Sequence, residues 1–320
     1  MARSESHPEP VSSEPTSLDL TASVGQVVLK NPIVAASGTF GYGLESAELL
    51  DLNALGGFVT KGLSLQPKQG NPSPRLWETP SGLINSIGLE NPGLDVFIDE
   101  YLPRLKDLDC ALVVNFFGAT RDDYFAAAER LDGLEGVAAV EMNLSCPNVK
   151  TGGLTFGSDP AVARQLVAGC RQRYSGPLWV KLGIVGPVTD LARAVVEAGA
   201  DALCVGNTIP AMAIDPWTRR PKLGAVSGGL SGPAIHPVAV KAVFSIARLG
   251  LGVPIVGIGG VRQGLDAVEF LLAGASAVQV GTQNLVEPAA PLRIAEEVAS
   301  YCRRVGVSAV SELIGAVRLD

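Results

Sequence analysis

The sequence predicts a closed (β/α)8 barrel, and three observations support this fold. Eight short segments of almost wholly apolar composition recur along the chain, as expected for parallel strands that are buried on both faces. Amphipathic stretches with helical spacing separate these segments, which makes the chain a series of strand–helix units. No G-x-G-x-x-G motif follows the first strand, and this counts against an open, doubly wound sheet. Eight such units close most naturally into a barrel.

The predicted barrel strands are short and rich in β-branched residues. In chain order they are Ile33–Ala36, Gly57–Thr60, Ala111–Asn115, Ala138–Asn143, Leu178–Leu182, Ala202–Val205, Pro254–Ile258 and Ala277–Val280. The helices expected between them include Arg121–Leu131, Pro160–Arg173, Asp190–Ala198, Pro237–Arg248 and Leu265–Ala273. Before the barrel we expect a β-hairpin from Leu18–Thr21 and Val27–Leu29, with its turn at Val24-Gly25-Gln26.

Two segments lie outside this regular alternation. Residues 64–93, between the second and third strands, are dense in Pro, Gly and Asn, and long loops of this kind are usually lids or binding loops. We expect an inserted loop over the mouth of the barrel, without a second domain. Residues 1–17 are polar and rich in Pro, Ser and Glu, which predicts a disordered tail before one barrel domain spanning 18–320.

Composition excludes several classes of function. The 320 residues carry a net charge of −7, whereas nucleic-acid binding needs a basic face. No apolar run approaches the roughly 18 residues of a membrane span, and the N-terminus is unlike a signal peptide, so we expect a soluble, cytoplasmic protein. The five cysteines form no C-x-x-C pair and there are only two histidines, His7 and His236. A metal site, an iron–sulfur cluster and a Ser-His-Asp triad are therefore not expected.

Polar residues or glycines stand at the carboxyl ends of all eight predicted strands, where barrel enzymes place their chemistry. They are Ser37, Thr39, Thr60, Lys61, Asn115, Asn143, Lys181, Asn207, Thr208, Gly259, Gly260, Gly281 and Thr282. Strands often end in polar residues simply because they reach solvent. Solvent exposure accounts poorly for a complete ring, so we interpret the ring as a functional mouth.

Glycines after the last two strands predict an anion site. Gly259-Gly260 follows the seventh strand and Gly281-Thr282 follows the eighth. Glycines at these positions let backbone N–H groups close around a phosphate, as is common in barrel enzymes. A phosphorylated ligand is therefore expected, and tight turns without a ligand are the alternative.

Other polar residues at the mouth have more than one interpretation. Lys61 and Lys181 can form a Schiff base, offset the charge of a bound anion, or be solvated rim residues. Four asparagines offer amide donors and acceptors that complement a pyrimidine-like ring, although asparagine also favours turns for local reasons. These four are Asn85, Asn143, Asn148 and Asn207.

Cys146 differs from the other four cysteines. Cys110, Cys170, Cys204 and Cys302 fall in or beside strand and helix patterns, where a free cysteine is usually a small buried hydrophobe. Cys146 follows the fourth strand in a glycine-containing loop, where it could reach a ligand. Because histidine is nearly absent, this thiol is the best proton acceptor that the chain offers. Cys146 is therefore the candidate catalytic residue.

Several long motifs, in matching order over about residues 18–290, resemble the dihydroorotate dehydrogenases. The motifs are Asn31-Pro32-Ile33-Val34-Ala35-Ala36-Ser37-Gly38-Thr39-Phe40-Gly41, Gly70-Asn71-Pro72-Ser73-Pro74-Arg75, Asn85-Ser86-Ile87-Gly88-Leu89-Glu90-Asn91-Pro92-Gly93, Asn143-Leu144-Ser145-Cys146-Pro147-Asn148-Val149-Lys150, Gly228-Gly229-Leu230-Ser231-Gly232-Pro233-Ala234-Ile235, and Gly259-Gly260 with Gly281-Thr282. Cys146 resembles the soluble class, because the membrane-associated class has serine there. Gly152-Gly153 and Phe156-Gly157 resemble its NAD-linked subclass.

The resemblance implies FMN-dependent oxidation of dihydroorotate to orotate in pyrimidine biosynthesis, with Cys146 removing the C5 proton while C6 delivers a hydride to the flavin. The residues implied for FMN binding are Ser37, Lys61, Gly62, Asn115, Asn143, Lys181, Gly206, Gly232, Gly259, Gly260, Gly281 and Thr282. Those implied for orotate binding are Lys61, Asn85, Ser86, Ile87, Gly88, Leu89, Asn143, Asn148, Asn207 and Thr208. The last glycines and Thr282 would hold the phosphate, which agrees with the anion site inferred above.

The resemblance also implies a partner protein. In the NAD-linked subclass, electrons leave FMN through a subunit that carries FAD and an iron–sulfur cluster. This chain has neither the cysteine spacing nor the dinucleotide motif for those groups, so a homodimer joined by two such partners, a heterotetramer, is implied. Three places depart from the family's pattern near the cofactor: Gly183–Pro187, Gly206 and Phe116-Phe117.

Other functions remain as alternatives to this one. The related dihydropyrimidine dehydrogenase module shares the barrel, FMN and a cysteine base, but it reduces uracil or thymine. A phosphosugar aldolase or isomerase would use Lys61 or Lys181 to form a Schiff base. A flavin-binding barrel without catalytic activity is a further alternative.

Overall fold

Eight parallel strands close into a barrel in the computed structural model, which describes residues 18–145, 150–151, 154–155 and 157–320. Around the barrel the strands are β3 (Ile33–Ala35), β4 (Gly57–Val59), β7 (Ala111–Phe116), β8 (Ala139–Asn143), β11 (Leu178–Leu182), β12 (Ala202–Val205), β17 (Ile255–Ile258) and β18 (Ala277–Val280). Each pairs in parallel with its neighbours, and β18 pairs with β3 to close the ring. The predicted (β/α)8 fold is confirmed, with strand ends within a residue of those expected.

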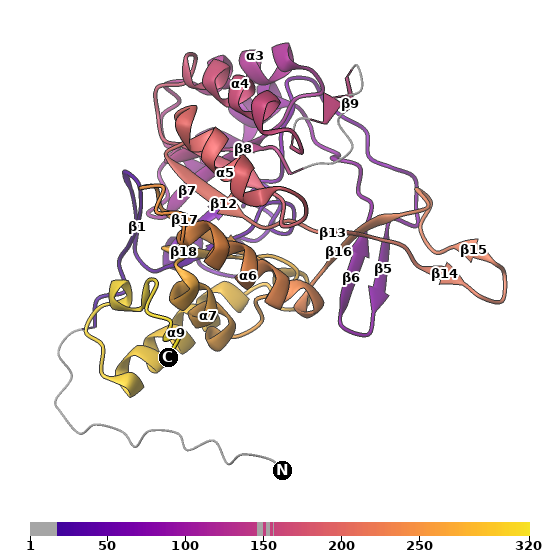
Figure 1. The fold of residues 1–320 in the computed structure, drawn as a ribbon. Helices are drawn as coiled ribbons and strands as arrows, with labels where there is room; N and C mark the ends of the chain where they lie inside the picture. Colours follow the sequence, from indigo (N-terminus) through magenta and orange to yellow (C-terminus); the bar gives the residue numbers. More distant parts are fainter. Residues whose placement is uncertain (1–17, 146–149, 152–153, 156) are drawn as a thin grey trace.

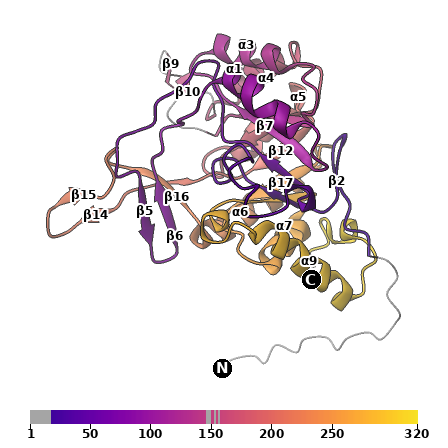
Figure 2. The same cartoon turned by 180° about the vertical axis from the view of Figure 1, so that it is seen from behind.

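Helices surround the barrel on its outer side (Figures 1 and 2). They are α1 (Leu94–Val96), a π-helix (Phe97–Tyr101), α2 (Leu102–Leu105), α3 (Arg121–Leu131), α4 (Pro160–Arg171), α5 (Val188–Glu197), α6 (His236–Ala247), α7 (Gly264–Ala273), α8 (Gln283–Val286) and α9 (Ala290–Val305), with 3-10 turns at Leu52–Ala54, Pro233–Ile235 and Val310–Leu313. Thr120 caps the start of helix α3: its side chain accepts a hydrogen bond from Asp123 N, while the Asp123 carboxylate accepts one from Thr120 N. No helix among the described residues is long and apolar enough to cross a membrane.

Side chains on each barrel strand alternate between the helices and the barrel interior. On β7, Leu112, Val114 and Phe116 pack under the helices, whereas Ala111 and Val113 belong to a separate interior cluster. The N-terminal hairpin contributes Ala22, Val24, Val27 and Leu29 to the same interior cluster. Its strands, β1 (Ala22–Val24) and β2 (Val27–Leu29), therefore add apolar side chains to the inside of the barrel.

The predicted first strand of that hairpin was wrong by several residues. Leu18–Thr21 was expected to be extended, but the first strand is Ala22–Val24. The second strand, Val27–Leu29, and the turn at Gly25, whose φ is +63°, are as predicted. The burial pattern explains the shift, because Ala22 and Val24 are buried while Ser23 is exposed. Upstream, Asp19 accepts a hydrogen bond from Thr21 N and forms a bridge with Ala309 near the C-terminus instead.

The insertion after β4 is more regular than a loop. It contains the hairpin of β5 (Leu76–Thr79) and β6 (Gly82–Asn85), which joins β13 (Ile209–Ala211) and β16 (Gly228–Ser231) in a four-stranded antiparallel sheet, here called the mouth sheet. Beyond it, β14 (Ile214–Asp215) and β15 (Arg220–Pro221) form an arm that extends away from the barrel (Figure 1). Strands β9 (Lys150–Thr151) and β10 (Leu154–Thr155) make a further small hairpin after β8.

Candidate active site at the mouth of the barrel

The inward positions of β7, β8 and β11 bring three of the predicted residues together at the carboxyl ends of the strands. Lys181 on β11 pairs with Asn143 on β8, and Asn115 on β7 pairs with Glu141 two residues earlier on β8. All four residues are buried, with Lys181 5% and Asn143 7% exposed. The barrel thus places an ammonium group, a carboxylate and two amides around one small volume.

Glu141 forms the centre of a hydrogen-bonded group that the sequence analysis did not identify. Its Oε1 accepts hydrogen bonds from Asn115 Nδ2 at 2.6 Å and Lys181 Nζ at 3.3 Å. Its Oε2 accepts one from Gln279 Nε2 at 2.7 Å, and that nitrogen also lies 3.8 Å from Cys204 Sγ. Glu141 and Gln279 are the polar exceptions inside two apolar strands, and they lie two residues before Asn143 and Gly281. Residues two apart on a strand face the same side, so the positions of Asn143 and Gly281 could have predicted that Glu141 and Gln279 also point into the barrel.

A second hydrogen-bonded chain joins the ends of β8 and β12. Asn143 Oδ1 accepts hydrogen bonds from Ser145 N at 3.1 Å and from Ser145 Oγ at 2.6 Å. Ser145 Oγ in turn accepts a hydrogen bond from Asn207 Nδ2, and Asn207 Oδ1 accepts one from Thr208 N at 2.7 Å. These contacts unite three residues predicted for the substrate, Asn143, Asn207 and Thr208. They also anchor Ser145, which the sequence analysis did not assign to the site.

The mouth sheet brings Asn85 towards the same place. Asn85 pairs with Gly229 across β6 and β16, and its Nδ2 donates to Gly229 O at 3.4 Å. A Cβ at Gly229 would lie 2.5 Å from Thr208 Cβ, so the sheet and Thr208 are in close contact. Ser86 is buried, while Ile87, Gly88 and Leu89 are partly exposed. The insertion therefore forms one wall of the mouth.

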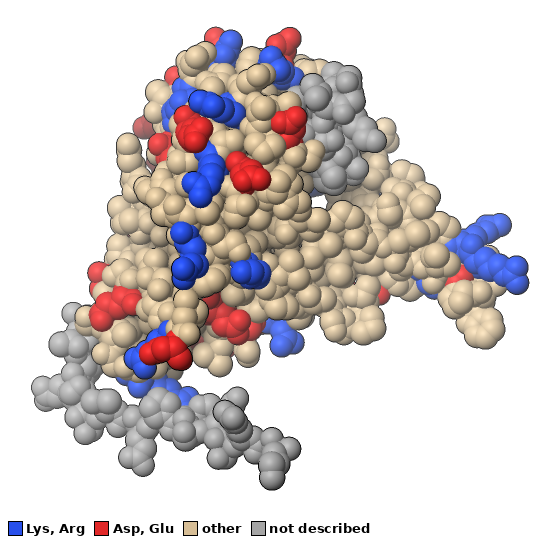
Figure 3. Space-filling view, viewed as in Figure 1, with Lys and Arg blue, Asp and Glu red and all other residues tan. Residues whose placement is uncertain are grey.

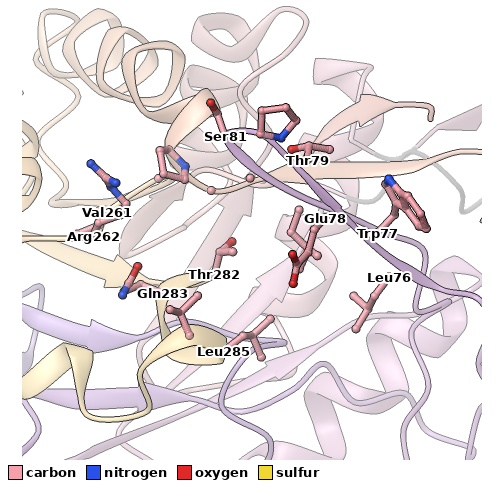
Figure 4. A pocket seen from close by; sticks show the side chains of 17 residues that line it. Leu76, Trp77, Glu78, Thr79, Ser81, Val261, Arg262, Thr282, Gln283 and Leu285 are labelled. Carbon is pink, nitrogen blue, oxygen red and sulfur yellow. The ribbon is translucent and has the colours of Figure 1, made fainter. Parts of the chain in front are cut away.

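Three of the five residues predicted for a phosphate border a cavity of about 850 Å³ between the mouth sheet and the loops after β17 and β18, whereas Gly259 and Gly281 do not line it. Its lining includes Gly232, Gly260 and Thr282, and Figure 4 shows Thr282, Gln283 and Leu285 facing Trp77 and Glu78 of the β5–β6 hairpin. Thr282 Oγ1 donates to Ser231 Oγ at 2.8 Å, which ties the loop after β18 to the mouth sheet. Ser231 is a further residue that the sequence analysis did not assign.

The glycine conformations in this region leave no room for side chains. Gly259 and Gly260 have φ values of +138° and +70°, and Gly232 has a φ of +94°. A Cβ on Gly260 would lie 2.6 Å from His236 Cβ and 2.9 Å from Gly232 O. His236 Nδ1 lies 3.0 Å from Gly259 O and braces the same loop. Close backbone approach of this kind is what an anion-binding loop requires.

The remaining predicted residues lie at the ends of β3, β4 and β12. Ser37 follows β3 directly after Ala36, and the Cβ of Ala36 lies 3.8 Å from where a Cβ on Gly281 would be. After β4, Lys61 N donates a hydrogen bond to Gly41 O at 2.7 Å. Gly62 lies against Asn115, because a Cβ there would be 2.8 Å from Asn115 Oδ1 and 3.3 Å from Phe117 Cδ1. Phe117, one of the departures from the family's pattern, thus packs beside Gly62. Gly206, another departure, has a φ of +150° and lies where the end of β12 closely approaches Ile258 of β17.

Cys146 and Asn148 fall outside the described residues, as do Gly152, Gly153 and Phe156, so their predicted roles stay predictions. The other four cysteines are not disulfide-bonded. Burial raises the pKa of Cys110 to about 11 and that of Cys170 to about 12, and it also raises the pKa of Cys302. Burial and the neighbouring Glu141 carboxylate raise the pKa of Cys204 well above its usual value. At neutral pH these four thiols are protonated and unsuited to act as bases.

The fold and the mouth define a class of protein: a (β/α)8-barrel enzyme whose strand ends carry amide and ammonium groups beside glycine-rich loops. A model of the dihydroorotate dehydrogenase family matches residues 19–301. The chain belongs to the dihydroorotate dehydrogenase family and is an oxidoreductase.

Relatives agree with this assignment, and solved structures agree with the fold. Proteins from Geobacter sp. (strain M21) and Geotalea daltonii, both named dihydroorotate dehydrogenase B (NAD(+)), catalytic subunit, are 49% and 50% identical to this chain over 302 residues, covering 94% of it and 99% of each relative. The ligand-free dihydroorotate dehydrogenase of Eimeria tenella superposes with a TM-score of 0.78 at 23% identity, covering 94% of this chain and 92% of that one. Its complex with ferulenol gives a TM-score of 0.77 at 24% identity, covering 93% and 88%. At that identity the structures support the fold.

Proposed function

We propose that this chain is the catalytic subunit of an NAD-linked dihydroorotate dehydrogenase, which oxidises dihydroorotate to orotate in pyrimidine biosynthesis with FMN as its cofactor. The observation that carries the proposal is the convergence of Asn115, Asn143 and Lys181 at one end of the barrel, beside glycine-rich loops. Residues 18–320 would act as one FMN-binding domain. A cytoplasmic location stays a prediction from the sequence.

The residues at the mouth fit both the ring and the phosphate of FMN. Asn115 Oδ1 and Gln279 Oε1 are buried acceptors that have no hydrogen-bond partner among the described residues, and they suit a polar ring that carries N–H groups. The cavity bordered by Gly232, Gly260 and Thr282 suits the phosphate. When bound, FMN would supply the redox chemistry as the acceptor of the hydride from C6 of the substrate.

The chain's own residues would bind the substrate and move its proton. The Lys61 ammonium would offset the substrate carboxylate, and the amides of Asn85, Asn143 and Asn207 would pair with the amide groups of the pyrimidine ring. Cys146 would remove the proton from C5. Its neighbour Ser145 is held between Asn143 and Asn207, which supports a fixed starting point for that loop.

A partner subunit that holds FAD and an iron–sulfur cluster would pass the electrons to NAD. The relatives are named as catalytic subunits, and the present sequence has no C-x-x-C pair for a cluster. A homodimer with two such partners would complete the assembly. The arm supports further association, because Met212, Ile214 and Trp217 are 48%, 56% and 92% exposed along it, and Lys and Arg side chains gather at its tip (Figure 3).

The visible spectrum of the purified protein tests this function. We expect a yellow protein whose flavin absorbance bleaches when dihydroorotate is added without oxygen, because the substrate reduces the bound cofactor. Dihydrouracil is the matched control, since it lacks the carboxylate that Lys61 would bind. Bleaching by dihydrouracil alone would support the dihydropyrimidine dehydrogenase alternative. A colourless protein that borohydride links covalently to a phosphosugar would support an aldolase.

The isolated chain is expected to reduce NAD at a negligible rate, since the route from FMN to NAD passes through the partner. Stopped-flow measurement would still detect fast flavin bleaching by dihydroorotate in the same preparation. Artificial dyes that accept electrons directly serve as the control for turnover. Full-rate NAD reduction by the chain alone would show that the partner hypothesis is incorrect.

A further inference from the structure

The most buried charged group at the mouth is Glu141, whose side chain is fully buried. It faces the Lys181 ammonium at 3.3 Å, and the Lys181 side chain is itself only 7% exposed. A pair so far from water is electrostatically coupled, and removing either member leaves the other charge uncompensated. The charge that Lys181 presents to the mouth therefore depends on Glu141.

Glu141 also sets the orientation of two amides. A carboxylate only accepts hydrogen bonds, so Asn115 and Gln279 must turn their NH2 groups towards it, at 2.6 and 2.7 Å. Their oxygens are then the free ends, and both Asn115 Oδ1 and Gln279 Oε1 are buried without a partner among the described residues. A glutamine at position 141 would place an NH2 group among these donors and remove the constraint on the amide orientations.

We propose that Glu141 is a positioning residue that balances the charge of Lys181, directs the oxygens of Asn115 and Gln279 towards the bound flavin, and thereby lowers its reduction potential. This inference rests on the proposed function only in requiring that the mouth holds FMN. Electrostatics gives the direction of this effect on the reduction potential. Reduction adds electron density to the flavin, and a fixed negative charge nearby opposes it, whereas an uncompensated Lys181 favours it.

The test is the FMN reduction potential of holoenzyme carrying Glu141→Gln, measured by equilibration with a reference dye under chemical reduction. We expect the ratio of reduced to oxidised flavin at a fixed potential to rise about tenfold, which corresponds to roughly 30 mV for a two-electron couple. Glu141→Asp keeps the charge and should stay within about twofold of the wild type. Gln279→Met removes one of the two oriented amides but no charge, so we expect it to change the potential less than Glu141→Gln does.

An unchanged potential in Glu141→Gln, or an equal change in Gln279→Met, overturns the proposal. If Glu141→Gln does not fold, Lys181→Met and the double variant Glu141→Gln/Lys181→Met replace it, since removing both members of a buried pair is often tolerated. Lys181→Met alone should then lower the flavin reduction potential, and the double variant should restore the wild-type value. Equal potentials in Lys181→Met and the double variant overturn the proposal. Because chemical reduction needs no substrate, this result is independent of whether dihydroorotate bleaches the flavin.

Discussion

Replacing Cys146 by alanine is expected to reduce turnover of dihydroorotate by about 10²–10⁴-fold, the contribution typical of a general base. The loss should appear in kcat, because the substrate would still meet Lys61 and the asparagines at the mouth. Flavin content should stay unchanged, since none of the predicted phosphate residues is altered. Steady-state kinetics with an artificial electron acceptor measures the effect.

The four described cysteines provide matched controls for that experiment. Cys110→Ala is the most useful, because Cys110 lies just before β7 on the outer side of the barrel and burial raises its pKa to about 11. This variant should retain wild-type turnover. Wild-type turnover in Cys146→Ala would instead favour a flavin-binding barrel without this catalytic base. Cys146→Ser is expected to be slow as well, since serine is a much weaker acid than cysteine.

Replacing Gly206 by alanine is expected to lower the free energy of unfolding by about 3 kcal/mol, as backbone strain and overpacking each cost about 1–3 kcal/mol. Gly206 has a φ of +150°, and a Cβ there would lie 2.5 Å from Ile258 Cβ on the neighbouring strand. Neither β12 nor β17 can move away without disturbing the closed barrel. Urea unfolding of the two proteins measures the difference.

Gly183→Ala is the control for this second prediction. Gly183 follows β11 much as Gly206 follows β12, but it has no positive φ and a Cβ there would meet nothing within 4 Å. Its stability should change by less than about 1 kcal/mol. Equal stability of Gly206→Ala and Gly183→Ala would contradict the close approach of Gly206 and Ile258.

Most of the barrel could be predicted from the sequence because its strands and helices are defined locally. Helix α3 spans the predicted Arg121–Leu131, and β11 spans the predicted Leu178–Leu182. Apolar periodicity and caps such as Thr120 suffice for such elements. Glycines at two neighbouring strand ends of a barrel are typical of a phosphate site, and that site stays a prediction. The grouping of Gly260 with Gly232 around one cavity agrees with the predicted anion site.

The features that escaped prediction depend on residues far apart in the chain. Strand β6 pairs with β16, more than 140 residues later, and both contain glycines that weaken any local strand pattern. The position of β1 was predicted wrongly because it depends on which side chains enter the barrel interior. The inward position of Glu141 could have been inferred from its strand, but its contacts with Asn115, Lys181 and Gln279 depend on three other strands of the barrel.

The mouth sheet has a consequence for how substrate preference can diverge in this fold. It carries Asn85 and abuts Thr208, yet its backbone ladder is separate from that of the barrel that holds Lys181 and Asn143. Under the proposed function, the mouth sheet would contribute Asn85 to the substrate, whereas the barrel would hold most of the flavin, and side-chain links such as Thr282 to Ser231 join the two sheets. Substitutions in the mouth sheet would then alter that part of the substrate contacts while the hydrogen-bond ladder of the barrel stays intact.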